Sequence, residues 1–110
     1  MAGVDPIKLI EKRSLALHEE VARRIRRDPT VLVRARQRVE QWLRDGSTHP
    51  YYARAWQKVL DGGIDTACHT LVDPSEFAAS LRQASPFAGV IDPKTRWAVL
   101  RKLRQNPDAA

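Results

Sequence analysis

The side chains able to carry acid–base or nucleophilic chemistry are few and widely spaced. They are three histidines, His18, His49 and His69, and one cysteine, Cys68. Cys68 and His69 are neighbours, and adjacent residues on a helix point in different directions, whereas a thiol–imidazole pair needs facing groups. We therefore predict a buried Cys68, a helix-capping His49, and solvated His18 and His69.

Motifs for catalysis or cofactor binding are also missing from the sequence. Glu19 and Glu20 directly follow His18, so they cannot form a facing acid–base pair with it on a helix. There is no His-x-x-x-His spacing, no glycine-rich phosphate loop and no nucleophile elbow. A lone cysteine excludes an intramolecular disulfide and a cysteine-based zinc site. We predict that the protein is not an enzyme and uses no cofactor or metal.

Arginine is the other residue type with binding chemistry, and it is concentrated in one stretch. Residues 23–38 contain seven arginines and one acidic residue, so they carry the whole net charge of +6, while the remaining residues sum to zero. The planar guanidinium can bind two phosphate oxygens. We predict nucleic-acid-binding residues at Arg23, Arg24, Arg26, Arg27, Arg34 and Arg38. The alternatives are an acidic protein surface as the ligand, or plain solvated helix faces.

An apolar, irregular segment follows in "LRQASPFAGVID", residues 81–92. Pro86 ends a helix, Gly89 permits a turn, and Phe87 and Val90 are apolar. The segment either fills the protein's own core or is presented to a partner, since an aromatic anchor beside an arginine is typical of interface hot spots. The predicted partner contacts are Leu81, Arg82, Gln83, Ser85, Pro86, Phe87 and Val90.

The prolines indicate where helices begin. Asp-Pro occurs at 5–6, 28–29, 73–74 and 92–93, and Ser-Thr-His-Pro at 47–50. Asp is a good N-cap and Pro is favoured at the first helical position. The predicted helices span residues 6–27, 29–45, 50–61, 64–72, 74–84 and 93–105. With no strand or hairpin pattern, we expect an all-α fold, a compact bundle of five to six short helices, as one domain over 1–110 with frayed ends at 1–4 and 106–110.

Apolar side chains at helical spacing predict the core. The first helix has a stripe formed by Ile7, Ile10, Ser14, Leu17, Val21 and Ile25, and helix 74–84 shows Phe77 and Leu81. Trp42, Trp56 and Trp97 each lie on an apolar stripe, so we predict that they belong to the core.

Residues 66–83 have the length of a helix-turn-helix. In that interpretation Ser75 and Glu76 begin the recognition helix and Arg82 and Gln83 end it. Asp73 and Glu76 also have the spacing of a capping box. The acidic residues and the missing turn glycine argue against a DNA-binding helix-turn-helix.

No apolar run approaches the length needed to span a membrane, and the N-terminus has no secretion signal. We predict a soluble, cytoplasmic protein. The sequence leaves open whether it forms a homo-oligomer.

Two stretches, "RSLALHEEVARRIRRDP" (13–29) and "LRQASPFAGVIDPKTRWAVLRK" (81–102), resemble a group of small, all-helical bacterial antitoxin-like proteins. These belong to toxin–antitoxin loci, beside a toxin often of the nucleotidyltransferase class. The motifs at 14–18 and 81–89 carry the resemblance. It implies stoichiometric binding to a cognate toxin without catalysis, and repression of the protein's own promoter. Many antitoxins are acidic, whereas this chain is basic, which fits an acidic toxin or operator DNA.

The sequence therefore predicts an antitoxin-like binding protein. Segment 81–91 would contact the toxin, and the arginine-rich stretch would meet nucleic acid or an acidic surface of the toxin. The alternatives are a stand-alone DNA- or RNA-binding regulator and an adaptor without a toxin partner.

Overall fold

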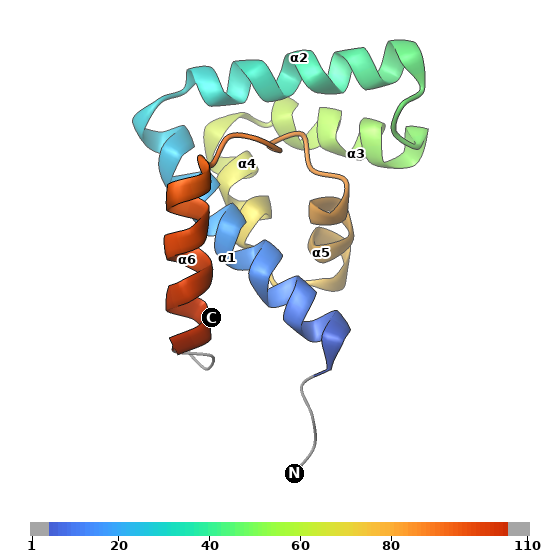
Figure 1. Cartoon of the computed structure of the whole chain (residues 1–110). Helices are drawn as coiled ribbons and strands as arrows, with labels where there is room; N and C mark the ends of the chain where they lie inside the picture. Colours follow the sequence, from blue (N-terminus) through green and yellow to red (C-terminus); the bar gives the residue numbers. More distant parts are fainter. Residues whose placement is uncertain (1–4, 106–110) are drawn as a thin grey trace.

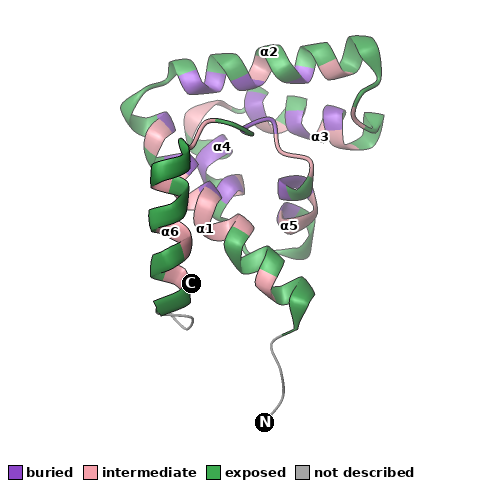
Figure 2. Cartoon of the chain, viewed as in Figure 1, coloured by how far each residue is buried: buried purple, intermediate pink, exposed green. Residues whose placement is uncertain are grey.

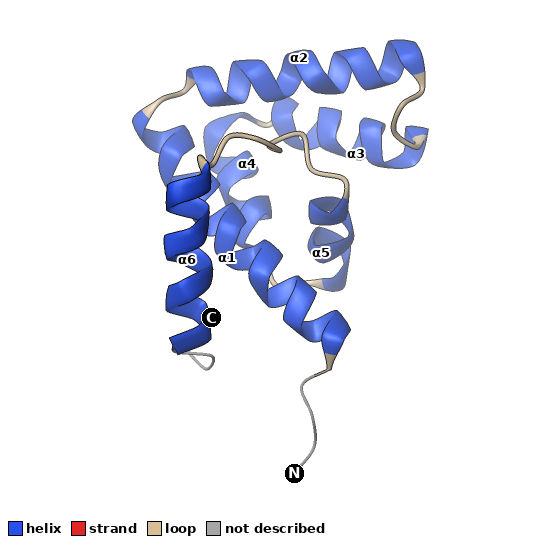
Figure 3. Ribbon diagram, viewed as in Figure 1, coloured by secondary structure: helices blue, strands red, loops and turns tan. Residues whose placement is uncertain are grey.

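The computed structural model describes residues 5–105, and all of its regular structure is helical (Figures 1 and 3). The helices are α1 (Pro6–Arg27), α2 (Thr30–Asp45), α3 (Pro50–Asp61), α4 (Gly63–Val72), α5 (Glu76–Gln83) and α6 (Pro93–Gln105). This confirms the predicted all-α class. The ends that we predicted to be frayed lie outside the described residues.

Helix α1 is the central element of the fold. It packs against α4, α6, α5 and α2, while α2 also lies along α3 (Figure 1). The segment between α5 and α6, residues 84–92, crosses the molecule close to α2 before the chain turns down into α6 (Figure 1). Among the described helices, none combines the length and apolarity needed to cross a bilayer.

Most helix ends have the predicted caps. The Asp5 carboxylate accepts from the Ile7 N–H at 2.9 Å, and His49 Nδ1 accepts from the Tyr51 N–H at 3.1 Å. Gly46 ends α2 in the left-handed conformation, with φ of 70°. Such a conformation favours glycine because it carries no Cβ.

The predicted start of α5 is wrong by two residues. The Ser75 hydroxyl caps α5 by accepting from the Ala78 N–H at 3.2 Å. The Asp73 carboxylate accepts instead from the Ser75 N–H at 2.9 Å, so it closes the turn before the helix. The predicted capping box between Asp73 and Glu76 is therefore absent, because the serine two residues further along supplies the cap.

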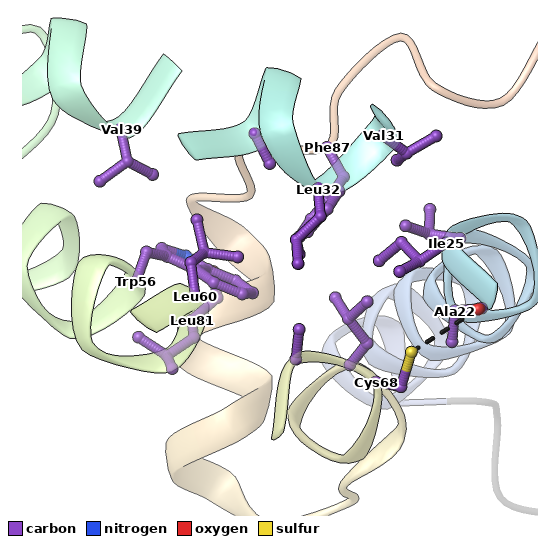
Figure 4. Close-up of a cluster of buried hydrophobic side chains, with 14 residues drawn as sticks. Ala22, Ile25, Val31, Leu32, Val39, Trp56, Leu60, Cys68, Leu81 and Phe87 are labelled. Carbon is purple, nitrogen blue, oxygen red and sulfur yellow. Dashed lines mark hydrogen bonds between the residues drawn. The ribbon is translucent and has the colours of Figure 1, made fainter. Parts of the chain in front are cut away.

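The core lies between α1, α2, α3 and α4 and is closed by α5 and Phe87 (Figure 4). Trp56 is fully buried, and its indole N–H donates to the Leu81 carbonyl at 3.0 Å. Phe87 packs edge-on against Trp56, with ring centroids 5.8 Å apart. The indole N–H of Trp56 thus has a hydrogen-bond acceptor, and its ring packs against an apolar side chain.

Several side chains predicted to be in the core lie at the surface. Ile7 is 67% exposed, Ile10 52%, Phe77 52% and Trp97 54%, while Trp42 is half-buried. The first turns of α1 extend beyond the helices that cover its second half, where Val21 and Ile25 are buried (Figure 2). The apolar spacing was correct for a helix but did not show how much of that helix has a neighbour.

Candidate functional site

The segment at residues 84–92 inserts Phe87 into the protein's own core. Phe87 is only 3% exposed, and Pro86 is buried beside it. Leu81 and Arg82, at the end of α5, are buried as well. These four predicted contact residues are buried, although Arg82 and Phe87 border the cavity described below. Of the other three, Gln83 is exposed, and Ser85 and Val90 are half-buried.

Two arginines from the predicted nucleic-acid cluster hold this segment. Arg38 donates to the Ala88 carbonyl at 2.8 Å and to the Pro86 carbonyl at 3.5 Å. Because these carbonyls belong to a turn, no helical N–H satisfies them, and the guanidinium takes that place. The turn itself uses Gly89, whose φ is 84°.

Arg24 holds the other end of the segment. It donates to the Val90 carbonyl at 3.2 Å and to the Asp92 carboxylate at 2.9 Å, where α6 begins. Asp92 also accepts from the Thr95 N–H, and bonds from Thr95 and Arg24 hold the pKa of this carboxyl well below its usual range. Arg24 and Arg38 are therefore structural residues here, which weakens the prediction that they bind nucleic acid.

Most of the other arginines in the cluster form ion pairs on the surface. Arg23 pairs with Glu20 at 2.9 Å, and Arg27 reaches the same carboxylate at 3.5 Å. Arg26 pairs with Asp65 at 3.1 Å. Among the six predicted nucleic-acid residues, only Arg34 forms no hydrogen bond or ion pair with the described residues. Five of the seven arginines in residues 23–38 thus have a carboxylate partner, and three of these share Glu20.

His18 and Ser85 meet although they are 67 positions apart. His18 is 8% exposed, which corrects the prediction that it is solvated. Its Nδ1 lies 2.7 Å from the Ser14 carbonyl, which can only accept, so Nδ1 carries the proton. Burial lowers the pKa of His18, so the ring is neutral and Nε2 accepts from the Ser85 hydroxyl at 2.8 Å.

The His18–Ser85 pair fixes the start of the segment. A hydroxyl that donates to a neutral imidazole is also the arrangement of a serine nucleophile and its base. Here, however, the Ser85 oxygen also accepts from the Phe87 N–H at 3.1 Å. The hydroxyl therefore closes a turn and ties it to α1. No spacing in the sequence indicated this contact, because both residues are single positions on distant elements.

Arg82 closes the C-terminal end of α4. Its Nη1 donates to the Asp73 carbonyl at 2.7 Å and reaches the Thr70 and Leu71 carbonyls at 3.3 and 3.4 Å. A cation is favourable there because the last carbonyls of a helix carry partial negative charge. The helix-turn-helix interpretation placed Arg82 at the end of a recognition helix, but its guanidinium is buried against α4 carbonyls and does not face a DNA ligand.

A cavity of about 430 Å³ lies between α1, the end of α5, the 84–92 segment and α6. Its apolar wall includes Ile10, Leu17 and Ile91, and Arg13, Arg82 and Arg96 supply cations. No aspartate or glutamate is among the described residues that line it.

A second hollow continues the cavity toward the start of α1. It shares Ile10 and Gln83 with the first cavity and is lined further by Ile7, Glu11 and Glu76. We call the two together the α1 groove. Four residues of the predicted contact set line it, Arg82, Gln83, Ser85 and Phe87, together with α1 residues that the sequence assigned to the core.

No protein family model matches the sequence, and neither the curated proteins nor the solved structures include a significant match. The described residues also contain no group of three or more histidine, cysteine, aspartate or glutamate side chains able to hold a metal ion.

Proposed function

We propose that this protein is an antitoxin-like binding protein that neutralises a cognate toxin by forming a stoichiometric complex through the α1 groove. One observation carries the proposal, namely the uncovered half of the apolar stripe on α1. Ile7 and Ile10 are spaced three residues apart, face the groove, and are 67% and 52% exposed.

The chain leaves this apolar surface to be covered by another molecule. Burying an isoleucine side chain contributes about 1.5–3 kcal/mol relative to leaving it in water. Exposed apolar side chains that adjoin a hollow rimmed by charged residues are typical of protein interaction sites. The resemblance of residues 13–29 and 81–102 to antitoxin-like proteins supplies the class of partner, a toxin.

The 84–92 segment keeps a role in this proposal, but as a wall of the groove. Phe87 anchors it inside, while Ser85 and Ile91 line the cavity beside α1. A regulator that binds nucleic acid by itself receives less support, because Arg24 and Arg38 hold this segment and Arg23, Arg26 and Arg27 pair with carboxylates.

The experiment compares two double variants that add the same charge at exposed apolar positions. The test variant is Ile7→Glu with Ile10→Glu in the groove. The control is Val33→Glu with Leu43→Glu on α2, where the side chains are 52% and 38% exposed. Each tagged protein is expressed in the native cells and recovered from nuclease-treated lysate at moderately high salt.

The proposal predicts that the wild type and the α2 control each recover one stoichiometric protein. That protein should be encoded beside this one, be toxic when expressed alone, and be neutralised on co-expression. The groove variant should lose both recovery and neutralisation. Equal neutralisation by the groove variant would overturn the proposal, and so would recovery of nucleic acid as the only partner.

A further inference from the structure

The inner part of the α1 groove combines positive charge with apolar walls. Arg13, Arg82 and Arg96 line the cavity, and no carboxylate does so among the described residues. A ligand that complements this lining carries a negative charge for the arginines and apolar groups for the walls.

Two of these arginines are free to bind a ligand. The side chains of Arg13 and Arg96 form no hydrogen bond, ion pair or ring contact within residues 5–105, unlike those of Arg24 and Arg38. Arg13 lies on α1 and Arg96 on α6, so the two cations approach the cavity from different helices.

The third arginine is buried and forms no ion pair with a carboxylate of the described residues. Arg82 is 5% exposed, and its Nη1 bonds only to backbone carbonyls. Its Nε is buried without any hydrogen-bond partner in the described structure. The carboxylates of Asp73, Glu11 and Glu19 attract the Arg82 guanidinium without forming an ion pair with it. A counter-charge that comes nearer is favoured further.

From this charge arrangement we infer that the inner groove receives an acidic segment of the partner protein. An aspartate or glutamate of that segment lies between Arg13 and Arg96, and apolar side chains on either side of it contact Ile10, Leu17 and Ile91. The inference rests on the proposed function and adds the chemistry of the partner surface. A cavity of about 430 Å³ suits one acidic and a few apolar side chains, since sites for compact ligands span roughly 300–1,000 Å³.

The position of the acidic residue follows from the two ends of the groove. Glu11 and Glu76 line the outer hollow near Ile7, so a carboxylate would be repelled there. The arginines of the inner cavity attract it instead. The bound segment therefore has one orientation, with its acidic residue toward α6.

A display selection tests the inference with peptides in place of the partner protein. Random twelve-residue peptides on phage are selected against the full-length protein, and the enriched peptides are synthesised and measured by calorimetry. The test variant is Arg13→Gln with Arg96→Gln. The control, Lys94→Gln with Lys102→Gln, removes the same charge from α6 residues outside the cavity.

The enriched peptides should carry an aspartate or glutamate flanked by apolar residues. They should bind the wild type and the lysine control equally, and the arginine variant about tenfold more weakly or worse, since charge-assisted hydrogen bonds are lost. The inference is overturned if no peptide is enriched, if the enriched peptides lack an acidic residue, or if acidic peptides bind the arginine variant equally well. If an oligonucleotide displaces the peptides and a free acidic peptide does not, the cavity binds phosphate groups and the inference is wrong.

The two proposals can fail separately. If the arginine variant still neutralises the toxin while the Ile7→Glu, Ile10→Glu variant does not, the proposed function stands and the acidic segment is wrong. If neither variant affects neutralisation, both are wrong.

Discussion

At the scale of single residues, the bond from Ser85 Oγ to His18 Nε2 shows how one contact positions the groove wall. Its length is 2.8 Å, and both residues line the cavity. No local sequence pattern predicts this hydrogen bond, because Ser85 lies in a loop and His18 lies in the middle of α1. The prediction of a solvated His18 considered only its helical neighbours, whereas the partner comes from the other end of the chain.

Ser85→Ala should destabilise the protein by about 1–3 kcal/mol, because the buried His18 Nε2 and the Phe87 N–H lose their partner. The free energy of unfolding can be measured with urea. Ser47→Ala is the control, since Ser47 is exposed and should change stability by less than about 0.5 kcal/mol. Equal effects of the two substitutions would refute the structural role of Ser85.

The stability should also depend on pH through His18. Burial lowers its pKa in the folded state, the bond to the Ser14 carbonyl opposes this shift, and the charge of Arg82 adds to it. The unfolded chain therefore binds a proton at higher pH than the folded protein, so stability is full above about pH 6.5 and falls as the pH drops below it.

This dependence can be tested between pH 7 and pH 5, a window that brackets the ordinary histidine pKa of about 6.5. His18→Gln should reduce the change in unfolding free energy across that window. The same substitution at the exposed His69 should leave the change as in the wild type. The assignment fails if His18→Gln leaves the dependence intact.

At the scale of elements, local signals predicted helix boundaries better than helix environments. Asp-Pro and His-Pro marked the starts of α1, α3 and α6, because capping depends on adjacent residues. The same reasoning placed α5 too early, since Ser75 competes with Asp73 for the cap. Which half of α1 is covered depends on distant helices, so its apolar spacing could not show that Ile7 and Ile10 are exposed.

Substitution of each of the two phenylalanines compares a core position with a surface position in one experiment. Phe87→Ala should cost about 3–5 kcal/mol because it removes the ring packed on Trp56, a large share of the 5–15 kcal/mol typical of a folded domain. Phe77→Ala, at a position 52% exposed, should cost far less. Denaturant unfolding of both variants checks this, and similar losses would show that segment 84–92 is not anchored by Phe87.

At the scale of the whole molecule, the net charge of +6 does not show which basic side chains lack a partner in the fold. In the fold, arginines from residues 23–38 form ion pairs with Glu20 and Asp65 and donate hydrogen bonds to carbonyls of the 84–92 segment. The cations that line the cavity without a partner, Arg13 and Arg96, lie outside that stretch. Charge density along a sequence does not show which charges a fold compensates.

The proposed function requires protein–protein contact in the α1 groove. The most direct test is calorimetry of the purified partner against this protein at about 0.1 M and 0.5 M salt, where screening lengths differ about twofold. We expect a one-to-one complex with a negative heat-capacity change, a modest salt dependence, and loss of binding in the Ile7→Glu, Ile10→Glu variant. A contradictory result would be a complex that forms as tightly with that variant. Binding only to oligonucleotides would also contradict it, with affinity falling by about 0.9 log units per phosphate contact for each tenfold rise in salt.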